Sequence, residues 1–356
     1  MNITFLIGNG FDLNFDLKTS YTDFYDYYCN LESTKNDMLA RAIGKDYKNW
    51  SDLEMGLADY VNSLDIRQID EFIESKVCLE DGLVEYLKKQ EERVLFADET
   101  RVAEMFRSKV LNFCEDLNAE WREEYKEVRK KANSAIQYQF VTFNYTEVLD
   151  KLVELCTRKY SPFSSHTAGS TTYQDTILSP LHIHGTLSED LILGIDSIEQ
   201  LSSLELRRNE QLVSCFVKTQ MNKELGEHRI ERFKKIIEQS QYIVLYGLSC
   251  GDSDKTWWKY LIEWLKSAPE KRLVFCVYID GYVSGSAAKK LRIINEKKKI
   301  FASQGDCDND AFEAIKERIQ VVINSKLFSI KGIQVNPEKQ DDEQMKMQLK
   351  ELAGVV

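Results

Sequence analysis

Two histidines and an asparagine are the side chains of this sequence best suited to acid–base chemistry. His182 and His184 are two of only four histidines and lie in the apolar segment 181–187, while Asn144 follows the β-rich segment 138–143. A histidine exchanges protons near neutral pH, and an asparagine amide can orient a hydroxyl group or a water. We therefore predict that His184 is a general base or holds the ligand. For Asn144 we predict contact with a ribose hydroxyl or a water, with a helix N-cap as the alternative.

The spacing of His182 and His184 also permits a metal pair. On a strand, two residues that are two positions apart share one face, and paired imidazoles are common zinc ligands. No acidic or cysteine ligands follow them in a recognisable pattern, and the eight cysteines include no Cys-x-x-Cys pair. We therefore expect no zinc site, with a structural histidine as the other alternative.

Glycine turns follow two of the predicted strands. The apolar segment 2–7 ends in Gly8-Asn9-Gly10, and the segment 241–246 ends in Gly247-Leu248-Ser249. Glycine lets a ligand approach the backbone closely, and the N–H groups of a following helix attract phosphate. These turns predict the wall of a nucleotide site, although a simple tight turn explains the same residues.

Carboxylates stand beside the same turns. Asp12 lies in the opening turn, and Asp280 ends the strand-like segment 273–280, where it could bind a ribose diol. Asp252 and Asp254 either cap the helix that follows them or bind sugar hydroxyls. With Glu54, the acids Asp12, Asp252 and Asp254 could instead bind Mg²⁺ through their oxygens.

Strands followed by helices must position these residues. Because the carboxyl ends of parallel strands meet at one edge of a sheet, the strand-end clusters predict a single site. We predict an α/β fold with a Rossmann-like parallel sheet. Its core is expected at residues 1–20 and 132–330, with a large helical insertion after the first strand at 21–131 and a charged C-terminal tail at 331–356. The segment 161–179, rich in serine and threonine, is expected to be a long loop.

The composition narrows the classes of ligand. The chain has 356 residues, 43% of them hydrophobic, and a net charge of −11. This charge disfavours a broad nucleic-acid surface or a surface for anionic membranes, so a small ligand is expected. The scattered cysteines, the lack of a signal peptide and the lack of a long apolar run predict a reduced, cytoplasmic protein.

Four motifs in order resemble the bacterial abortive phage infection AbiH family over nearly the whole chain. They are Ile-Gly-Asn-Gly-Phe-Asp-Leu at 7–13 with Thr-Ser-Tyr-Thr-Asp-Phe at 19–24, Thr-Phe-Asn-Tyr-Thr at 142–146, His-Ile-His-Gly at 182–185, and Tyr-Gly-Leu-Ser-Cys-Gly-Asp-Ser-Asp-Lys at 246–255. The order glycine turn, Thr-x-Asn, His-Gly and Gly-x-Ser is more distantly similar to the sirtuin-like NAD-binding fold, including NAD-hydrolysing domains of antiphage systems.

This resemblance implies an antiphage effector that binds NAD and hydrolyses its nicotinamide–ribose bond. It places the opening turn at the diphosphate and the Gly247 turn at the adenosine half. Asp12 departs from the sirtuin pattern, and its carboxylate would repel the phosphates unless it is turned away or paired. The sirtuin zinc ribbon is absent, so an acyl-lysine substrate is not expected. The expected catalytic residues are Asn144 and His184, and the expected NAD-binding residues are Gly8, Asn9, Gly10, Asp12, Thr142, Gly247, Ser249 and Asp280.

Two other functions remain open at this point. One is a metal-dependent nuclease or nucleotide-processing effector that uses the four carboxylates named above. The other is a non-catalytic sensor that binds a nucleotide, with the helical insertion transmitting the bound state. The expected partners are a nucleotide, a phage-derived trigger and further copies of the chain.

Overall fold

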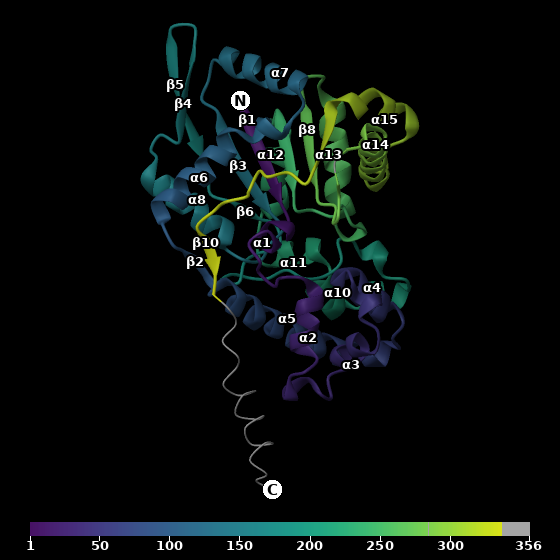
Figure 1. Cartoon of the computed structure of the whole chain (residues 1–356). Coiled ribbons are helices and arrows are strands. Elements are labelled where there is room, and N and C mark those ends of the chain that lie inside the picture. Colours follow the sequence, from purple (N-terminus) through teal and green to yellow (C-terminus); the bar gives the residue numbers. More distant parts are fainter. Residues whose placement is uncertain (284, 337–356) are drawn as a thin grey trace.

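A mostly parallel sheet forms the centre of the molecule (Figure 1). The computed structural model describes residues 1–283 and 285–336, without the side chain of Asp252. The strand order is β4-β5-β3-β1-β7-β8-β9, with β6 also paired to β3, and every pair except β4–β5 is parallel. The strands are β1 (Asn2–Ile7), β3 (Gln137–Thr142), β4 (Ser164–Ala168), β5 (Thr171–Ile177), β6 (Leu181–His182), β7 (Tyr242–Tyr246), β8 (Arg272–Val277) and β9 (Ile319–Ile323).

This order is that of a doubly wound α/β sheet. From β1 the chain adds β3 and β6 on one side, then returns to add β7, β8 and β9 on the other side. Residues pair in direct register, Ile3 with Tyr138 on one side and with Tyr242 on the other. The predicted α/β class with a parallel sheet is confirmed, and the order places a topological switch point between β1 and β7, where such folds bind ligands.

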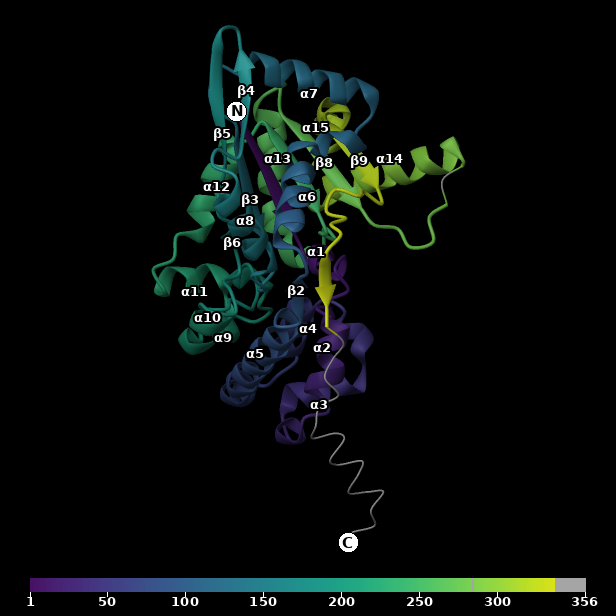
Figure 2. The ribbon, with the colours of Figure 1, turned by 60° about the vertical axis from the view of Figure 1, so that its left-hand side comes forward.

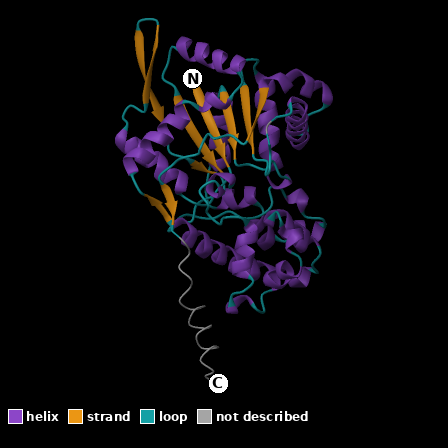
Figure 3. Ribbon diagram, in the orientation of Figure 1, coloured by secondary structure: helices purple, strands orange, loops and turns teal. Residues whose placement is uncertain are grey.

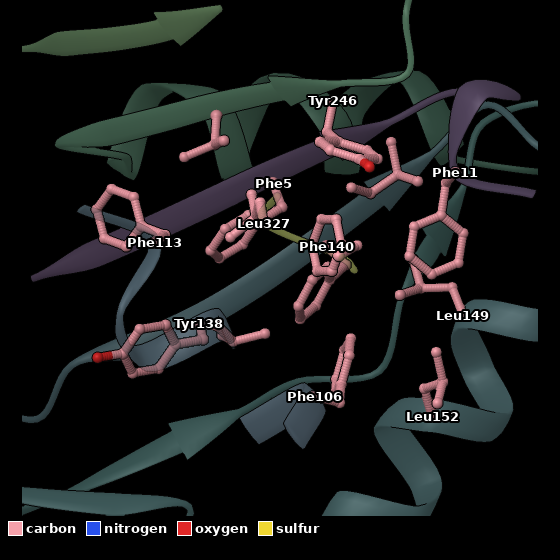
Figure 4. Packing of buried hydrophobic residues seen from close by; sticks show 14 of the residues in the cluster. Phe5, Phe11, Phe106, Phe113, Tyr138, Phe140, Leu149, Leu152, Tyr246 and Leu327 are labelled. Atoms are coloured by element: carbon pink, nitrogen blue, oxygen red, sulfur yellow. The ribbon is translucent and has the colours of Figure 1, made fainter. Parts of the chain in front are cut away.

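Helices cover both faces of the sheet (Figure 3). On one face lie α6 (Glu99–Leu111), α7 (Ala119–Lys131) and α8 (Val148–Lys159), and on the other lie α12 (Arg229–Gln239), α13 (Lys255–Ser267), α14 (Ala287–Gln304) and α15 (Asn309–Ile315). The strands have apolar residues on both faces because both are buried. Phe5 and Phe140 stack at 5.0 Å in the apolar cluster between the sheet and α6, α7 and α8 (Figure 4). Leu6 and Val141 belong to a second apolar cluster, between the opposite face of the sheet and α12 to α15.

A helical lobe lies at the carboxyl edge of the sheet (Figures 1 and 2). We define it as residues 21–91 and 187–224, whose apolar side chains form most of a third cluster of their own. It contains α2 (Tyr21–Tyr28), α3 (Met38–Lys45), α4 (Leu53–Asn62), α5 (Ile69–Glu91), α9 (Leu204–Arg208), α10 (Glu210–Phe216) and α11 (Lys218–Glu224). The segment 21–131 is largely helical, but α6 and α7 pack on the sheet rather than in the lobe.

The prediction of a long loop at 161–179 is wrong, because β4 and β5 form an antiparallel hairpin there. Polar side chains stabilise it. Buried Asp175 accepts hydrogen bonds from Ser164 Oγ (2.7 Å) and from the backbone N–H of Ile136 (2.9 Å), and pairs with His166 Nδ1 at 2.8 Å. A composition rich in serine and threonine therefore reflects cross-strand pairing here.

The last described segment returns to the core. β10 (Ile333–Val335) pairs antiparallel with β2 (Val94–Phe96), which precedes α6. Of the predicted charged tail at 331–356, residues 337–356 lie outside the described residues. Within the described part of the chain, no helix has the length and apolar character needed to cross a membrane.

Candidate functional site

Three buried oxygens that accept no hydrogen bond lie where neighbouring strands end. Asp12 Oδ1 belongs to the short helix α1 (Gly10–Leu13) after β1, Asn144 Oδ1 follows β3, and Asp254 Oδ1 precedes α13 after β7. Among the described residues none of the three accepts a hydrogen bond. Because buried polar atoms are nearly always hydrogen-bonded, these acceptors indicate a place for water or for a ligand with hydroxyl groups.

The Asp12 carboxyl is buried and held by one neighbour. Its side chain is 1% exposed, and Oδ2 accepts a hydrogen bond from Thr146 Oγ1 at 2.5 Å. Burial raises the pKa of Asp12 to about 7, although Thr146 and Asn144 oppose this shift. A large fraction of this carboxyl is therefore neutral near pH 7, which lessens the repulsion that its charge would exert on a phosphate.

Asn144 is fixed through its backbone. Its N–H donates to Thr142 Oγ1 at 3.1 Å, and its carbonyl accepts from His182 Nδ1 at 3.0 Å. His182 Nε2 lies 2.8 Å from Asp150 Oδ2. Burial disfavours the charged imidazole, but Asp150 and the Asn144 carbonyl outweigh burial and raise the pKa of His182. When the ring is protonated, Nδ1 donates to the Asn144 carbonyl and Nε2 donates to Asp150, and these contacts hold Asn144 in place.

His184 has surroundings different from those of His182. β6 ends at His182, and His184 Nε2 lies 3.6 Å from Asp254 Oδ1, with its ring edge-on to Phe143 at 5.7 Å. Burial lowers the pKa of His184, and the charge of nearby Lys218 lowers it further. The imidazole is therefore neutral near pH 7 and can accept a proton.

A buried lysine joins the two chain segments that form the lobe. Lys218 Nζ is 2.6 Å from Glu54 Oε2 and 3.3 Å from Asp196 Oδ1. Burial disfavours its charge, but these carboxylates raise the pKa of Lys218 and keep the ammonium charged. Lys218 was not predicted, because it lies in a polar helical segment with no motif. Glu54 was predicted as a metal ligand or as an ordinary acid in the first turn of a helix, not as the partner of a buried lysine.

The two glycine turns contact each other directly. The N–H groups of Gly8 and Gly10 donate to the carbonyls of Tyr246 (2.9 Å) and Gly247 (3.0 Å). A Cβ on Gly10 would lie 2.6 Å from Gly247 Cα, and Gly247 itself has φ of +72°. Close backbone packing at the switch point thus requires these glycines. Their contact with a phosphate stays a prediction.

The remaining predicted ligand residues differ in exposure. Asn9 is engaged inside the protein, since it donates to the Thr19 carbonyl at 2.9 Å and accepts from Thr19 Oγ1 at 2.6 Å. Ser249 and Asp280 are exposed on the turns that follow β7 and β8. Across the described residues, no group of three or more His, Cys, Asp or Glu side chains is arranged to hold a metal ion.

Comparison with known families gives one match. The family model described as "Bacteriophage abortive infection AbiH" matches residues 4–276, about three quarters of the chain. The matched region begins within β1 and ends within β8, and it includes every candidate site residue except Asp280. No curated protein matches the chain.

Proposed function

The chain belongs to the bacteriophage abortive infection AbiH family, and on that basis we propose that it binds NAD at the carboxyl edge of its sheet and hydrolyses the nicotinamide–ribose bond. Family membership implies a role in abortive infection by phage. The NAD reaction is our proposal for how that role is carried out.

The main support is the set of three buried acceptor oxygens at the switch point. Asp12 Oδ1, Asn144 Oδ1 and Asp254 Oδ1 lie at the ends of adjacent parallel strands and accept no hydrogen bond from the residues described, although His184 Nε2 lies 3.6 Å from Asp254 Oδ1. A ribose and an attacking water supply hydroxyl donors, which such acceptors need. The doubly wound strand order favours a nucleotide at the same place.

Asn144 and His184 divide the chemistry between them. Departure of nicotinamide takes the electron pair of the glycosidic bond and leaves positive charge on the ribose. The Asn144 amide orients the water whose oxygen then bonds to that carbon, and neutral His184 accepts the proton that the water loses. The nearby Asp254 carboxylate, 3.6 Å from Nε2, stabilises the imidazolium that forms.

The site is closed in the described conformation. Asn144 is 7% exposed and His184 is 6% exposed, beneath the lobe that Glu54 and Lys218 tie together. NAD therefore enters only when the lobe moves from the sheet edge, and closure afterwards excludes bulk water from the reacting carbon.

The test is proton NMR of NAD incubated with the purified protein, with nicotinamide release as the readout. We expect release by the wild type, also in EDTA, and at least a 100-fold loss in Asn144→Ala and His184→Ala, on the scale typical of acid–base groups. Asn133→Ala is the matched control for Asn144→Ala, because Asn133 is exposed and precedes β3, at the opposite end of that strand.

Equal rates in all variants would refute the assignment of the two residues. Activity that EDTA abolishes would instead indicate the metal-dependent effector, and binding of NAD without any release would indicate a nucleotide sensor. Thermal unfolding of each variant checks that the substitutions leave the fold intact.

A further inference from the structure

One buried cation of this protein lacks close partners. In the described part of the chain, the buried basic side chains are Lys76, Lys218 and Arg229. Lys76 lies 2.5 Å from Glu80, and Lys218 lies 2.6 Å from a carboxylate of the lobe. Arg229 is equally buried, at 4% exposure, but it has no contact of comparable length.

The carboxylates nearest to Arg229 are beyond hydrogen-bonding distance. Arg229 Nε is 3.6 Å from Glu227 Oε2, and Nη2 is 3.8 Å from Glu189 Oε2. Its Nη1 is buried and has no acceptor within the described residues. A guanidinium has five N–H donors, and leaving them unpaired in the interior is costly. The side chains of Glu189 and Glu227 are 70% and 39% exposed, so both can turn outward and yield to another anion.

Arg229 is also the first residue of α12, and this end of the helix faces the site. Because α12 leads directly into the start of β7, its N-terminus lies at the carboxyl edge of the sheet. The preceding residue, His228, makes no side-chain capping hydrogen bond to it. Helical side chains lean toward the N-terminus, so the guanidinium and the uncapped N–H groups lie at the same end. Both attract negative charge.

The same face of α12 reaches the elements that hold the candidate site. Phe233, one turn after Arg229, packs against Trp257 with ring centroids 4.6 Å apart. Trp257 lies one turn after Asp254 in the chain, and its Nε1 is a further buried donor without an acceptor in the described chain. Glu189 belongs to the loop that leaves the core at His184.

We infer that Arg229 and the N-terminus of α12 form an anion subsite that binds a phosphate group of the nucleotide, displacing Glu189 and Glu227. The identification of the ligand as NAD rests on the proposed function. In that case Arg229 is the residue that binds the diphosphate of NAD. The opening turn is less suited to that task, since the N–H groups of Gly8 and Gly10 already donate to backbone carbonyls.

Isothermal titration calorimetry of the full chain with NAD and with inorganic pyrophosphate tests the subsite. We expect Arg229→Gln to weaken the binding of both ligands by about 10- to 100-fold, the loss of one charge-assisted contact, and Arg229→Lys to lose less. Arg232→Gln is the matched control, because Arg232 is exposed on the same helix, and its affinities should equal those of the wild type. Thermal unfolding and circular dichroism check that the variants fold.

The outcomes separate this inference from the NAD proposal. If the wild type binds pyrophosphate but not NAD, and Arg229→Gln no longer binds pyrophosphate, the subsite is supported and the NAD proposal is refuted. If Arg229→Gln and Arg229→Lys bind both ligands as the wild type does, the subsite is refuted and the NAD proposal survives. If the wild type binds neither ligand, both are refuted.

Discussion

The buried carboxyl of Asp12 makes the stability of the fold depend on pH in a defined direction. Its pKa is raised from its ordinary 3.8 to about 7, chiefly by burial. Between these two values the folded state keeps a proton that the unfolded chain releases, so the unfolded state gains relative stability as the pH rises. The stability contributed by the protonated form is complete below pH 3.8 and is lost by about pH 7.

The size of the effect follows from the shift. Each pKa unit corresponds to about 1.4 kcal/mol, so the full loss in free energy of unfolding is about 4 kcal/mol. The part that falls between pH 5 and pH 8 is about 2.5 kcal/mol. Asp12→Asn keeps the shape of the side chain but cannot ionise, so the variant lacks this loss.

Urea unfolding of the wild type and of Asp12→Asn at pH 5 and pH 8 measures this pH-dependent loss in the free energy of unfolding. We expect the stability of the wild type relative to the variant to fall by about 2.5 kcal/mol between the two pH values. The comparison cancels the titration of all other groups. Asp59→Asn, at an exposed aspartate, serves as the control and should show no such change. A wild-type-minus-variant difference that is the same at both pH values would refute the reasoning.

Two further predictions concern a buried ion pair and the packing of a glycine. Lys218→Met leaves the buried Glu54 without its cation and should lower the free energy of unfolding by about 3–5 kcal/mol in urea titrations, and Glu54→Gln in the same chain should restore part of the loss. Gly10→Ala should cost about 1–3 kcal/mol, because its Cβ would meet Gly247 Cα at 2.6 Å. Gly44→Ala has nothing within 4 Å and should stabilise helix α3 slightly, so equal effects of the two alanines would contradict this reading.

The central sheet was predictable because its strands are buried on both faces. Segments such as 2–7 and 241–246 are therefore mostly apolar on both faces, and the polar residues that follow them mark the carboxyl edge. Asn144 and His184 were selected on this basis, and the structure places them after β3 and β6. Their catalytic roles stay predictions.

The buried charges were not predictable from local patterns. Lys218 meets Glu54 across 164 positions of the chain, and Arg229 Nη2 lies 3.8 Å from Glu189 Oε2, in the loop that follows His184. Neither residue has a motif around it, because its environment arises only when segments far apart in the chain come together. The hairpin at 164–177 was missed for a similar reason, since its polar side chains pair with each other across the strands.

The lobe is formed by two separate segments of the chain, and this limits how it can move. The chain crosses between core and lobe at 14–20, 92–98, 183–187 and 225–228. A lobe with a single pair of connections can rotate about one hinge. With four connections, the backbone must change conformation at all four when the lobe moves. Two of them adjoin His184 and Arg229, so we expect opening of the lobe to displace the predicted base and the predicted phosphate ligand in the same motion. Under the proposed function, entry of the ligand and assembly of the reacting groups are then a single conformational step.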